Sequence, residues 1–414
     1  HSLAFRQLGI KKENVMQKHH YDDLGKKTNM VVDYNEYDNE HTGLFTTKSD
    51  LLRIVQLAKL RDITPEQQFN LKEHSQNITI HQLKQFVSDL NQYKKDYGLI
   101  DFTDMITEFV KSDKSPKFDV VFIDEAQDLS PIQWKMYDEL KKKSKYVILA
   151  GDDDQAIYGW AGADVQRFQR EPGKERVLPK SYRVPQNIQT IANKILNRIP
   201  NERRIIKKWQ PREETGNVYP ESYSLQEVPI QEGSWLILAR TNYRLISLIP
   251  DLKSMGIYFE YKNKKSYSEK LYKIVINWTR YVKGEELNEA EIKDILEYTT
   301  YKTIEEIDKN LKWYELLQLD LDDSLYIRKM LERKEPLSGE ARVKLSTIHT
   351  AKGGEADNVL LVLDMSRRTL ESLQKSLEKQ DEEHRVWYVG VTRAKQNLYF
   401  IAGKNKERSY DIES

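Results

Sequence analysis

The chain has 414 residues, which is enough for two to four domains with buried cores. Its 66 Lys and Arg nearly cancel its 65 Asp and Glu, so contact with nucleic acid would have to come from local basic patches. The absence of cysteine excludes a disulfide framework and is typical of a reducing cytoplasm. No apolar run approaches the roughly 20 residues of a membrane helix and no signal-peptide pattern occurs, so we expect a cytoplasmic protein without a membrane partner.

The first hundred residues predict polar helices. Apolar residues recur at helical spacing between Asp50 and Leu60. Thr64 and Thr79 each begin a capping box with Gln three residues later, and Pro65 occupies a first helical position, so helices are expected to start at both places. The buried stripe of the second helix is expected at Leu83, Phe86, Val87, Leu90 and Tyr93.

A short apolar run, Val120–Ile123, ends abruptly in Asp124 and Glu125. Four consecutive β-branched or aromatic residues predict a strand covered on both faces, as in a parallel sheet, and ligands bind at the carboxyl end of such strands. There one carboxylate of the Asp124–Glu125 pair can hold Mg²⁺ while its neighbour orients and deprotonates an attacking water, the division of labour that hydrolyses a nucleoside triphosphate. The alternative for a bare Asp-Glu pair is a strand followed by an acidic helix cap.

A second strand, Tyr146–Ala150, runs into the polar, glycine-containing segment Gly151–Asp164. Asp124–Asp128 resembles the second motif of superfamily-one helicases of the UvrD/Rep/PcrA type, and Gly151–Asp164 resembles their third motif. The two segments follow each other in this order and at short spacing. The resemblance implies an α/β fold with two RecA-like parallel-sheet motor domains of the P-loop NTPase type and helical insertions. It also implies that Gln155 senses the γ-phosphate and that Tyr158 and Trp160 contact DNA. Trp160 is expected to stack on a base, with a tryptophan packed in a core as the alternative.

The N-terminal residues His1–Phe5 resemble motif Ib of the family, which implies that His1 and Ser2 touch single-stranded DNA. The alternative is the start of an ordinary amphipathic helix. In the family this motif lies several tens of residues after the phosphate-binding loop, so we expect the chain to be truncated at its N-terminus. The nearest string to the GxxxxGK[ST] pattern is Gly25–Thr28, which has one glycine and no preceding apolar strand and is therefore expected to be an exposed turn.

Three later segments complete the resemblance. Val177–Arg183 resembles motif IV, in which Arg183 would stabilise charge on the transferred phosphoryl group and Tyr182 would stack on adenine; a surface salt bridge is the alternative for an isolated Tyr-Arg pair. Val343–Glu355 resembles motif V, and Glu382–Lys395 resembles motif VI. By resemblance, motif V supplies Gly354 and Glu355 to the nucleotide ribose and His349 to the DNA backbone, and motif VI supplies Arg393 as a second arginine finger.

The resemblance also divides the chain. Two motor domains, 1A and 2A, and two helical insertions, 1B and a reduced 2B, are expected at residues 1–10 with 98–178 (1A), 11–97 (1B), 179–265 with 343–414 (2A) and 266–342 (2B). Strands of the second motor domain are expected at Trp235–Arg240, Asn358–Asp364 and Leu398–Ala402, and a helix with apolar residues at a 3.6-residue period is expected from Ser268. Basic runs at Lys141–Lys145, Arg203–Lys208 and Lys262–Lys265 are expected to be mainly solvated faces, some of which line a DNA track.

The implied function is an ATP-dependent DNA translocase and helicase, moving 3′ to 5′ on single-stranded DNA and unwinding duplex, with ATP and Mg²⁺ in the cleft between the motor domains. Its partners would be single-stranded and partially duplex DNA, its oligomeric state a monomer, and its setting DNA repair or replication. The alternative is a single-stranded DNA-binding module without ATPase activity, if no phosphate loop precedes His1. A nuclease-coupled motor is a third, weaker reading, because the C-terminal residues contain no candidate metal cluster.

Overall fold

The computed structural model describes residues 1–30, 32, 49–74, 78–335, 340–374, 376–403 and 405–412. The chain forms two compact units, each of which gathers separate stretches of sequence. Unit 1 comprises His1–Val177, Leu196–Lys208 and Gln380–Val386, and unit 2 comprises Leu178–Ile195, Trp209–Lys379 and Trp387–Ser414.

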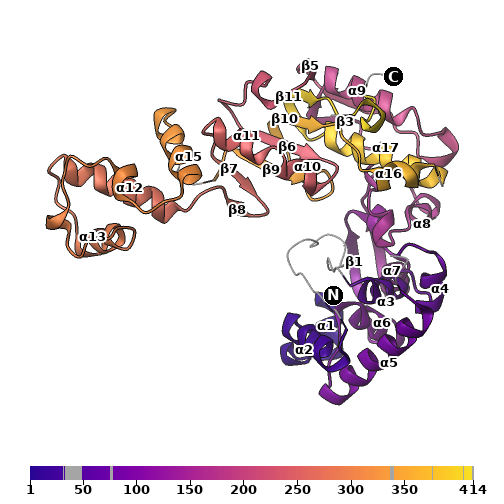
Figure 1. Ribbon diagram of the computed structural model, residues 1–414. Helices are drawn as coiled ribbons and strands as arrows, with labels where there is room; N and C mark the ends of the chain where they lie inside the picture. The colour runs from indigo at the N-terminus through magenta and orange to yellow at the C-terminus, as the bar shows by residue number, and fades with distance from the viewer. Residues whose placement is uncertain are drawn as a thin grey trace. The chain divides into compact units, whose positions relative to one another are not determined.

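Unit 1 is mainly helical (Figure 1). Its helices are α1 (Ser2–Leu8), α2 (Lys18–Thr28), α3 (Asp50–Leu60), α4 (Pro65–Asn70), α5 (Ile80–Tyr97), α6 (Phe102–Lys111), α7 (Pro131–Lys143) and α8 (Val165–Arg170). The predicted capping boxes are confirmed: Thr64 Oγ1 accepts from Gln67 N–H at 3.1 Å and Gln67 Oε1 accepts from Thr64 N–H at 2.8 Å, and Thr79 begins α5 in the same way. The predicted apolar face of α5 is buried at Leu83, Phe86, Leu90 and Tyr93.

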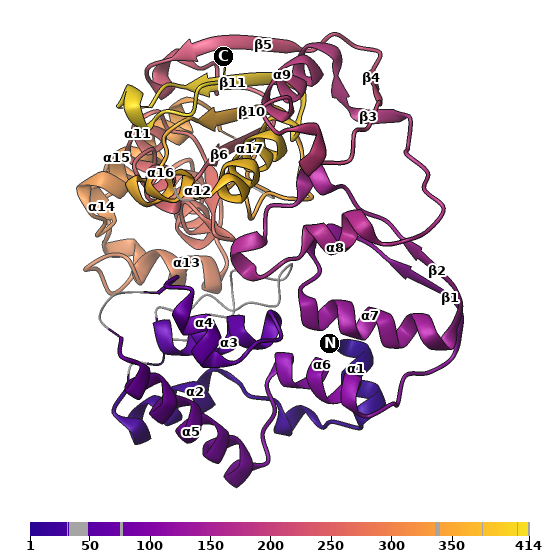
Figure 2. The same ribbon diagram turned by 90° about the vertical axis from the view of Figure 1, so that its right-hand side faces the viewer.

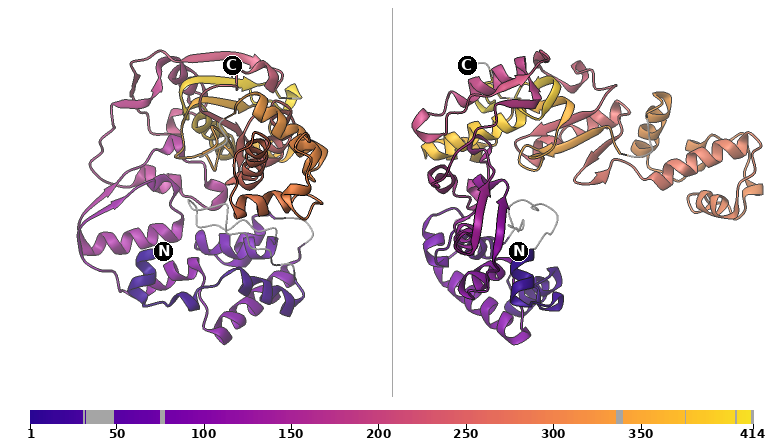
Figure 3. Two further views of the ribbon diagram at one scale, coloured as in Figure 1. Left: turned by 90° about the vertical axis from the view of Figure 1, so that its left-hand side faces the viewer. Right: turned by 180° about the vertical axis from the view of Figure 1, so that it is seen from behind.

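Unit 1 also contains the predicted strand with the carboxylates at its end. Strand β1 (Phe118–Ile123) pairs in parallel with β2 (Ser144–Leu149), and Ala150 N–H donates to the Ile123 carbonyl at 2.8 Å, which joins the ends of the two strands. The two strands run side by side when the molecule is seen from behind (Figure 3). Asp124 and Glu125 therefore follow β1 at the carboxyl end of a parallel pair, as predicted.

The expectation that β1 is covered on both faces is wrong. Phe122 is 74% exposed and Val120 lies exposed on the same face, whereas Val121 and Ile123 on the opposite face are half-buried. Helix α7 lies alongside β1 and β2 (Figure 2), and in the described residues these strands form a sheet of only two. A continuous apolar run predicts a suitable surface for two covering layers, but only tertiary contacts decide whether both are present.

Unit 2 contains a seven-stranded sheet in the order β5-β11-β10-β6-β9-β7-β8. Its strands are β5 (Asn217–Ser222), β6 (Trp235–Ala239), β7 (Phe259–Tyr261), β8 (Lys264–Lys265), β9 (Val343–Thr347), β10 (Ala356–Val362) and β11 (Ala394–Ile401). All neighbours are parallel except β7 and β8. Figure 2 shows β5, β11, β10 and β6 side by side in this order. A separate parallel pair is formed by β3 (Lys180–Pro185) and β4 (Gln210–Arg212).

The strands expected near Trp235, Asn358 and Leu398 are confirmed, and β6 is buried along its whole length. The remaining helices are α9 (Gln186–Leu196), α10 (Asn242–Ile246), α11 (Ile249–Ser254), α12 (Glu269–Val282), α13 (Glu289–Leu296), α14 (Trp313–Leu316), α15 (Leu321–Glu332), α16 (Arg367–Leu373) and α17 (Leu377–Val391). The helical period predicted from Ser268 corresponds to α12. The predicted α/β class with parallel sheets is thus confirmed.

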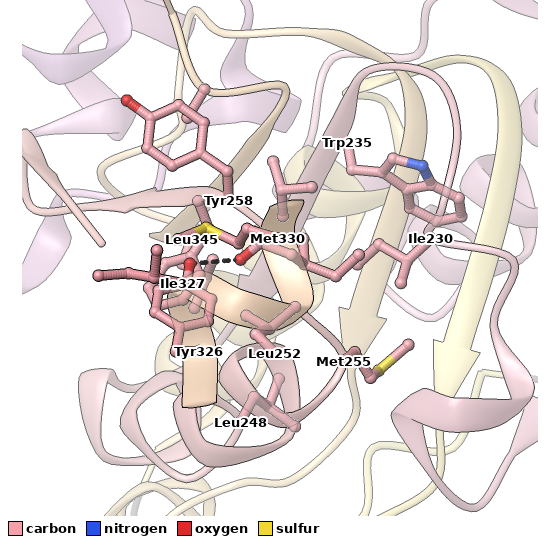
Figure 4. Packing of buried hydrophobic residues seen from close by; sticks show 14 of the residues in the cluster. Ile230, Trp235, Leu248, Leu252, Met255, Tyr258, Tyr326, Ile327, Met330 and Leu345 are labelled. Atoms are coloured by element: carbon pink, nitrogen blue, oxygen red, sulfur yellow. Dashed lines mark hydrogen bonds between the residues drawn. The ribbon is translucent and has the colours of Figure 1, made fainter. Parts of the chain in front are cut away.

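One apolar core joins the sheet of unit 2 to its helices. Tyr326 and Met330 of α15 pack near Leu252 of α11 and Leu345 of β9 (Figure 4). The Tyr326 hydroxyl donates to the carbonyl of Ile257 at 2.6 Å, so the one polar atom of this ring is satisfied inside the core. Among the described helices of both units, none is both long and apolar enough to cross a bilayer.

Candidate functional site

The two carboxylates after β1 are exposed and differ in backbone conformation. Asp124 Oδ1 accepts from the Glu125 N–H at 2.9 Å. Glu125 has φ of 51°, in the left-handed region that non-glycine residues rarely adopt and that costs on the order of 1 kcal/mol or more. A sharp turn therefore presents Asp124 and Glu125 at the strand end, and both carboxylates are reachable by a ligand from solvent.

Gln127 connects this turn to the loop after β2. Its side chain is completely buried; Nε2 donates to Glu125 Oε2, and Oε1 accepts from the Asp152 N–H at 3.0 Å. A Cβ on Gly151 would lie 2.6 Å from Gln127 Oε1, so only glycine leaves room for this amide. Gln127 was not predicted as a site residue, although it lies inside the Asp124–Asp128 string. Its role depends on a partner 25 residues away, which spacing alone does not identify.

The loop after β2 places Gln155 in the same network. Gln155 Nε2 donates to Asp152 Oδ2 at 2.8 Å. Asp152 is thus bonded to Gln127 through its backbone N–H and to Gln155 through its carboxylate. The sequence-predicted residues Glu125 and Gln155 are thus linked through Gln127 and Asp152, neither of which was predicted. This arrangement can fix the two predicted γ-phosphate-facing groups relative to each other.

Asp152, Asp153 and Asp154 form the one metal-like acidic group found in the described residues, with carboxylate oxygens within 4.8 Å of one another. The ammonium of Lys207 pairs with all three, at 2.5 Å from Asp152 Oδ1 and 3.0 Å from Asp154 Oδ2. Burial alone would raise the pKa of Asp153, but Lys207 outweighs it and holds this pKa below its usual value. Lys207 and Arg204, which pairs with Asp154, bring two positive charges to the three carboxylates, while burial raises the pKa of Asp154. The group is therefore a structural ion-pair cluster.

Trp160 is half-buried in the 3₁₀ turn Gly159–Ala161, and its backbone N–H donates to Glu382 Oε1 at 3.1 Å. Tyr158 is only 3% exposed, and its ring meets the Trp160 ring edge-on at a centroid distance of 6.3 Å. Burial raises the pKa of the Tyr158 hydroxyl, and the nearby carboxylates of Asp128 and Glu125 raise it further. The predicted DNA contact of Tyr158 is therefore not offered by an exposed ring; this side chain is buried beside Trp160.

His1 and Ser2 lie at the start of α1. The His1 ring packs edge-on against Phe102, with ring centroids 5.4 Å apart, while Ser2 is exposed. Ser2 is thus the more accessible of the two residues predicted to touch DNA.

Unit 2 brings Arg183 close to Glu355, and the exposed Tyr182 precedes Arg183 on β3. Tyr182 is 83% exposed on β3, with the Lys180 ammonium 5.8 Å from its ring centroid. Arg183 Nη1 lies 3.8 Å from Glu355 Oε2, and Lys395 Nζ lies 3.6 Å from Glu355 Oε1. By their chemistry, an exposed aromatic ring can stack on a base, an arginine can pair with phosphates, and a carboxylate can accept from a ribose hydroxyl.

Arg393, predicted as the second arginine finger, is buried in unit 2. It is 1% exposed; Nε donates to the Val389 carbonyl at 3.0 Å, Nη2 donates to Thr392 Oγ1 at 3.2 Å, and Nη1 reaches the Gly354 carbonyl at 3.4 Å. Gly354 and Arg393, both predicted site residues, are therefore in contact. In this conformation the guanidinium is committed to the protein interior, and contact with a phosphate would require it to leave these acceptors.

His349 is half-buried after β9. Burial lowers its pKa well below the usual value, and the positive charges of Arg240 and Lys352 lower it further. The imidazole is therefore neutral near pH 7. It can serve a DNA phosphate as a hydrogen-bond donor but adds no positive charge to the surface.

The basic runs are largely committed to ion pairs within the protein. In the second run, Arg203 pairs with Asp381, Arg204 with Asp154 and Lys207 with the acidic cluster. In the first run, Lys141, Lys142 and Lys143 pair with Glu171, Glu139 and Asp113. The expectation that these runs are mainly solvated faces is wrong for Arg204 and Lys207, whose charges compensate buried carboxylates.

Two domain families match the chain. The family model for the UvrD/REP helicase N-terminal domain matches residues 1–174, and that for the UvrD-like helicase C-terminal domain matches residues 262–405. The first includes the Asp124–Asp128 string and the Trp160 turn, and the second includes the segments of Glu355 and Arg393.

Similar proteins are found among bacterial helicases. The chain is 24% identical to a probable DNA helicase II homolog of Rickettsia conorii over 81% of this chain and 70% of that protein. It is 33% identical to DNA helicase II of Escherichia coli over 27% of this chain and 17% of that protein. It is 36% identical to the ATP-dependent DNA helicase PcrA of Leuconostoc citreum over 22% of this chain and 13% of that protein.

Proposed function

Because this chain belongs to the UvrD/Rep/PcrA-type family of superfamily-one helicases, we propose that it works as an ATP-dependent DNA translocase in a protein that also holds a phosphate-binding loop. It moves 3′ to 5′ on single-stranded DNA, unwinds duplex ahead of it, and hydrolyses ATP between its two motor domains. The motor domains are residues 1–10 with 98–178 and residues 179–265 with 343–414, and the helical insertions are residues 11–97 and 266–342. The protein acts as a cytoplasmic monomer in DNA repair or replication.

The observation that carries the proposal is the hydrogen-bonded connection from Glu125 through Gln127 and Asp152 to Gln155 in unit 1. Glu125 is the base that takes a proton from the attacking water, and Gln155 reads the γ-phosphate. The same loop continues to Trp160, which stacks on a base. Base–aromatic stacking tolerates any sequence, which suits a protein that moves along a strand.

Unit 2 supplies the remaining groups for the nucleotide. Tyr182 stacks on adenine, Glu355 accepts from the ribose, and Arg183 and Arg393 stabilise charge on the transferred phosphoryl group. Asp124 would hold Mg²⁺, because its exposed carboxylate offers the oxygen donors that this ion prefers, and the ion would supply positive charge to the phosphates. His1, Ser2 and His349 contact the DNA strand.

The test is ATP hydrolysis by the chain with and without oligo(dT), combined with stopped-flow translocation on oligo(dT) of increasing length. We expect DNA to stimulate hydrolysis. A fluorophore at the 5′ end should report arrival after a lag that grows with oligonucleotide length, whereas a 3′ fluorophore should show no such lag. A length-dependent lag at the 3′ end would overturn the polarity.

The second candidate function is a single-stranded DNA-binding module without hydrolysis. The GxxxxGK[ST] loop supplies the lysine and backbone amides that bind phosphates, so a protein without that loop would bind DNA but not hydrolyse ATP. DNA binding with no detectable hydrolysis would support this module and contradict the motor. Either activity requires DNA binding that weakens as salt rises, because bound counterions are released from the phosphates.

A further inference from the structure

A contact in unit 1 ties the Trp160 turn to helix α17. Glu382 Oε1 accepts from the Trp160 N–H at 3.1 Å. The same carboxylate closely approaches the preceding residue: a Cβ added to Gly159 would lie 3.1 Å from Glu382 Oε1 and 3.3 Å from Oε2. The carboxylate of Glu382 therefore sits directly against the backbone of the turn that carries the predicted base platform.

The position of Glu382 is itself held by its neighbours on α17. Asp381, which is buried, receives a two-pronged ion pair from Arg203, with Nε to Oδ2 at 2.6 Å and Nη2 to Oδ1 at 3.0 Å. One turn further along, Arg385 Nη2 donates to the Arg203 carbonyl at 2.9 Å. Two side chains on α17 thus bond to Arg203, and these contacts hold this part of the helix within unit 1.

Arg203 in turn belongs to a segment anchored on the loop after β2. Gln169 Nε2 donates to Asp153 Oδ2 at 3.0 Å and reaches the Arg203 carbonyl at 3.3 Å, and the Ile205 N–H donates to Asp153 Oδ2 at 2.8 Å. The chain from Asp153 to Trp160 is therefore held at both ends. Asp153 is tied to the Arg203–Ile205 segment, that segment is tied to α17, and α17 returns to Trp160 through Glu382.

We infer that Glu382 is a positioning residue for the base platform, which sets the orientation of the Trp160 ring through the backbone of its turn. This inference rests on the proposed stacking role of Trp160. A negative charge close to a DNA-binding surface repels phosphates, so a carboxylate there requires a compensating function. Accepting the Trp160 N–H is such a function, because a turn held at its backbone keeps the indole ready to stack and reduces the ordering cost of binding.

The test separates stacking from phosphate attraction by comparing two fluorescent oligonucleotides of equal length, oligo(dT) and an abasic strand with the same phosphates. Anisotropy titrations give the ratio of their dissociation constants for each variant, and this ratio cancels any change in electrostatic attraction. Trp160→Ala is expected to lower the preference for oligo(dT) by about fivefold or more. Glu382→Ala is expected to lower it by at least about threefold, in the same direction, and the double variant is expected to lose no more than Trp160→Ala alone.

Glu382→Gln keeps an acceptor oxygen for the Trp160 N–H while removing the charge, so it should retain the wild-type ratio. Glu378→Ala is the matched control, because it removes a carboxylate from an exposed position in the first turn of the same helix. A wild-type ratio in Glu382→Ala together with a lowered ratio in Trp160→Ala would overturn the inference and leave the stacking role intact. A lowered preference for oligo(dT) in Glu382→Gln would also overturn the inference, because it would show that the charge of Glu382 matters and not its acceptor oxygen.

An unchanged ratio in Trp160→Ala would overturn the stacking role itself, and the inference with it. These binding measurements require no ATP hydrolysis, so the absence of hydrolysis would contradict the proposed motor without affecting the result for Glu382.

Discussion

At the scale of single residues, the structure distinguishes exposed groups that can reach a ligand from buried groups that are hydrogen-bonded within the protein. Glu125 is exposed on a left-handed turn, whereas Gln127, two residues later, is fully buried and joins that turn to Asp152. Strained backbone persists only where its surroundings determine it, and here the buried amide of Gln127 does so. The carboxylate proposed as the catalytic base is thus held in position by a neutral neighbour.

Glu125→Gln should abolish turnover while preserving structure. The new amide oxygen can still accept from Gln127 Nε2, but it cannot take a proton from water, so hydrolysis should fall by about 10²–10⁴-fold. Steady-state hydrolysis at saturating oligo(dT) measures this, with DNA binding expected to stay unchanged. Glu108→Gln, at an exposed position on α6, is the control. Wild-type turnover in Glu125→Gln would reject Glu125 as the base.

Substitution of the two predicted arginine fingers should affect the free energy of unfolding differently. Arg183→Ala and Arg393→Ala are each expected to slow hydrolysis by about 10³-fold or more. Only Arg393→Ala should also lower the free energy of unfolding, by about 2 kcal/mol or more, because it removes three buried donors from their acceptors. Denaturant unfolding beside kinetics measures both effects. Lost stability with normal turnover in Arg393→Ala would make Arg393 a structural residue alone.

At the scale of elements, two apolar parallel strands with similar sequences have different surroundings. Strand β6 is buried at every position between β9 and β10, whereas one face of β1 is exposed. Composition gives both the same prediction, since β-branched and aromatic residues favour any parallel strand. The number of neighbouring strands and helices makes the difference, and it depends on segments distant in sequence.

Substitutions on these strands should reveal that difference. Phe122→Ser on β1 is expected to change the free energy of unfolding by less than about 0.5 kcal/mol, because its side chain already faces solvent. Ile237→Ala on β6 should cost about 2–5 kcal/mol, because it leaves a cavity in the core of unit 2. Urea titrations of both variants test the contrast. An equally large loss in Phe122→Ser would mean that β1 is covered in solution.

At the scale of the whole molecule, unit 1 depends on a buried charge network as well as on its apolar core. Lys59 of α3 and Lys94 of α5 both pair with Asp101 and Asp104 at the start of α6. Burial alone would raise the pKa of Asp101, but Lys59 and Lys94 outweigh it and hold this pKa well below the usual value of 3.8. Four charges thus fasten three helices that are separated in sequence by up to about fifty residues.

This network predicts loss of stability in acid. A carboxyl group whose pKa is lower in the folded state stabilises the fold above its unfolded pKa of 3.8, and this contribution disappears as pH falls below that value. Asp101→Asn keeps an oxygen to cap α6 but removes the charge, so it should cost about 3 kcal/mol near neutral pH and flatten the acid-dependent loss.

Hydrogen exchange of amides in α3, α5 and α6 measures the stability of unit 1 separately from that of unit 2. Asp96→Asn, exposed on α5, is the control for loss of a carboxylate. If the stability of unit 1 depends on pH equally in the wild type and in Asp101→Asn, other groups cause the loss of stability in acid.

The sequence by itself determined the helix starts at Thr64 and Thr79, the parallel strands, the carboxylates at the end of β1 and the family, because these depend on local patterns and on ordered motifs. Only the tertiary structure decided that Phe122 is exposed, that Tyr158 and Arg393 are buried, that Lys207 pairs with three aspartates, and that Gln127 and Glu382 hydrogen-bond to Glu125 and Trp160. Each of these depends on partners up to about two hundred residues away. Burial and ion pairing are set by the three-dimensional neighbours of a side chain, and residue type and spacing do not specify those neighbours.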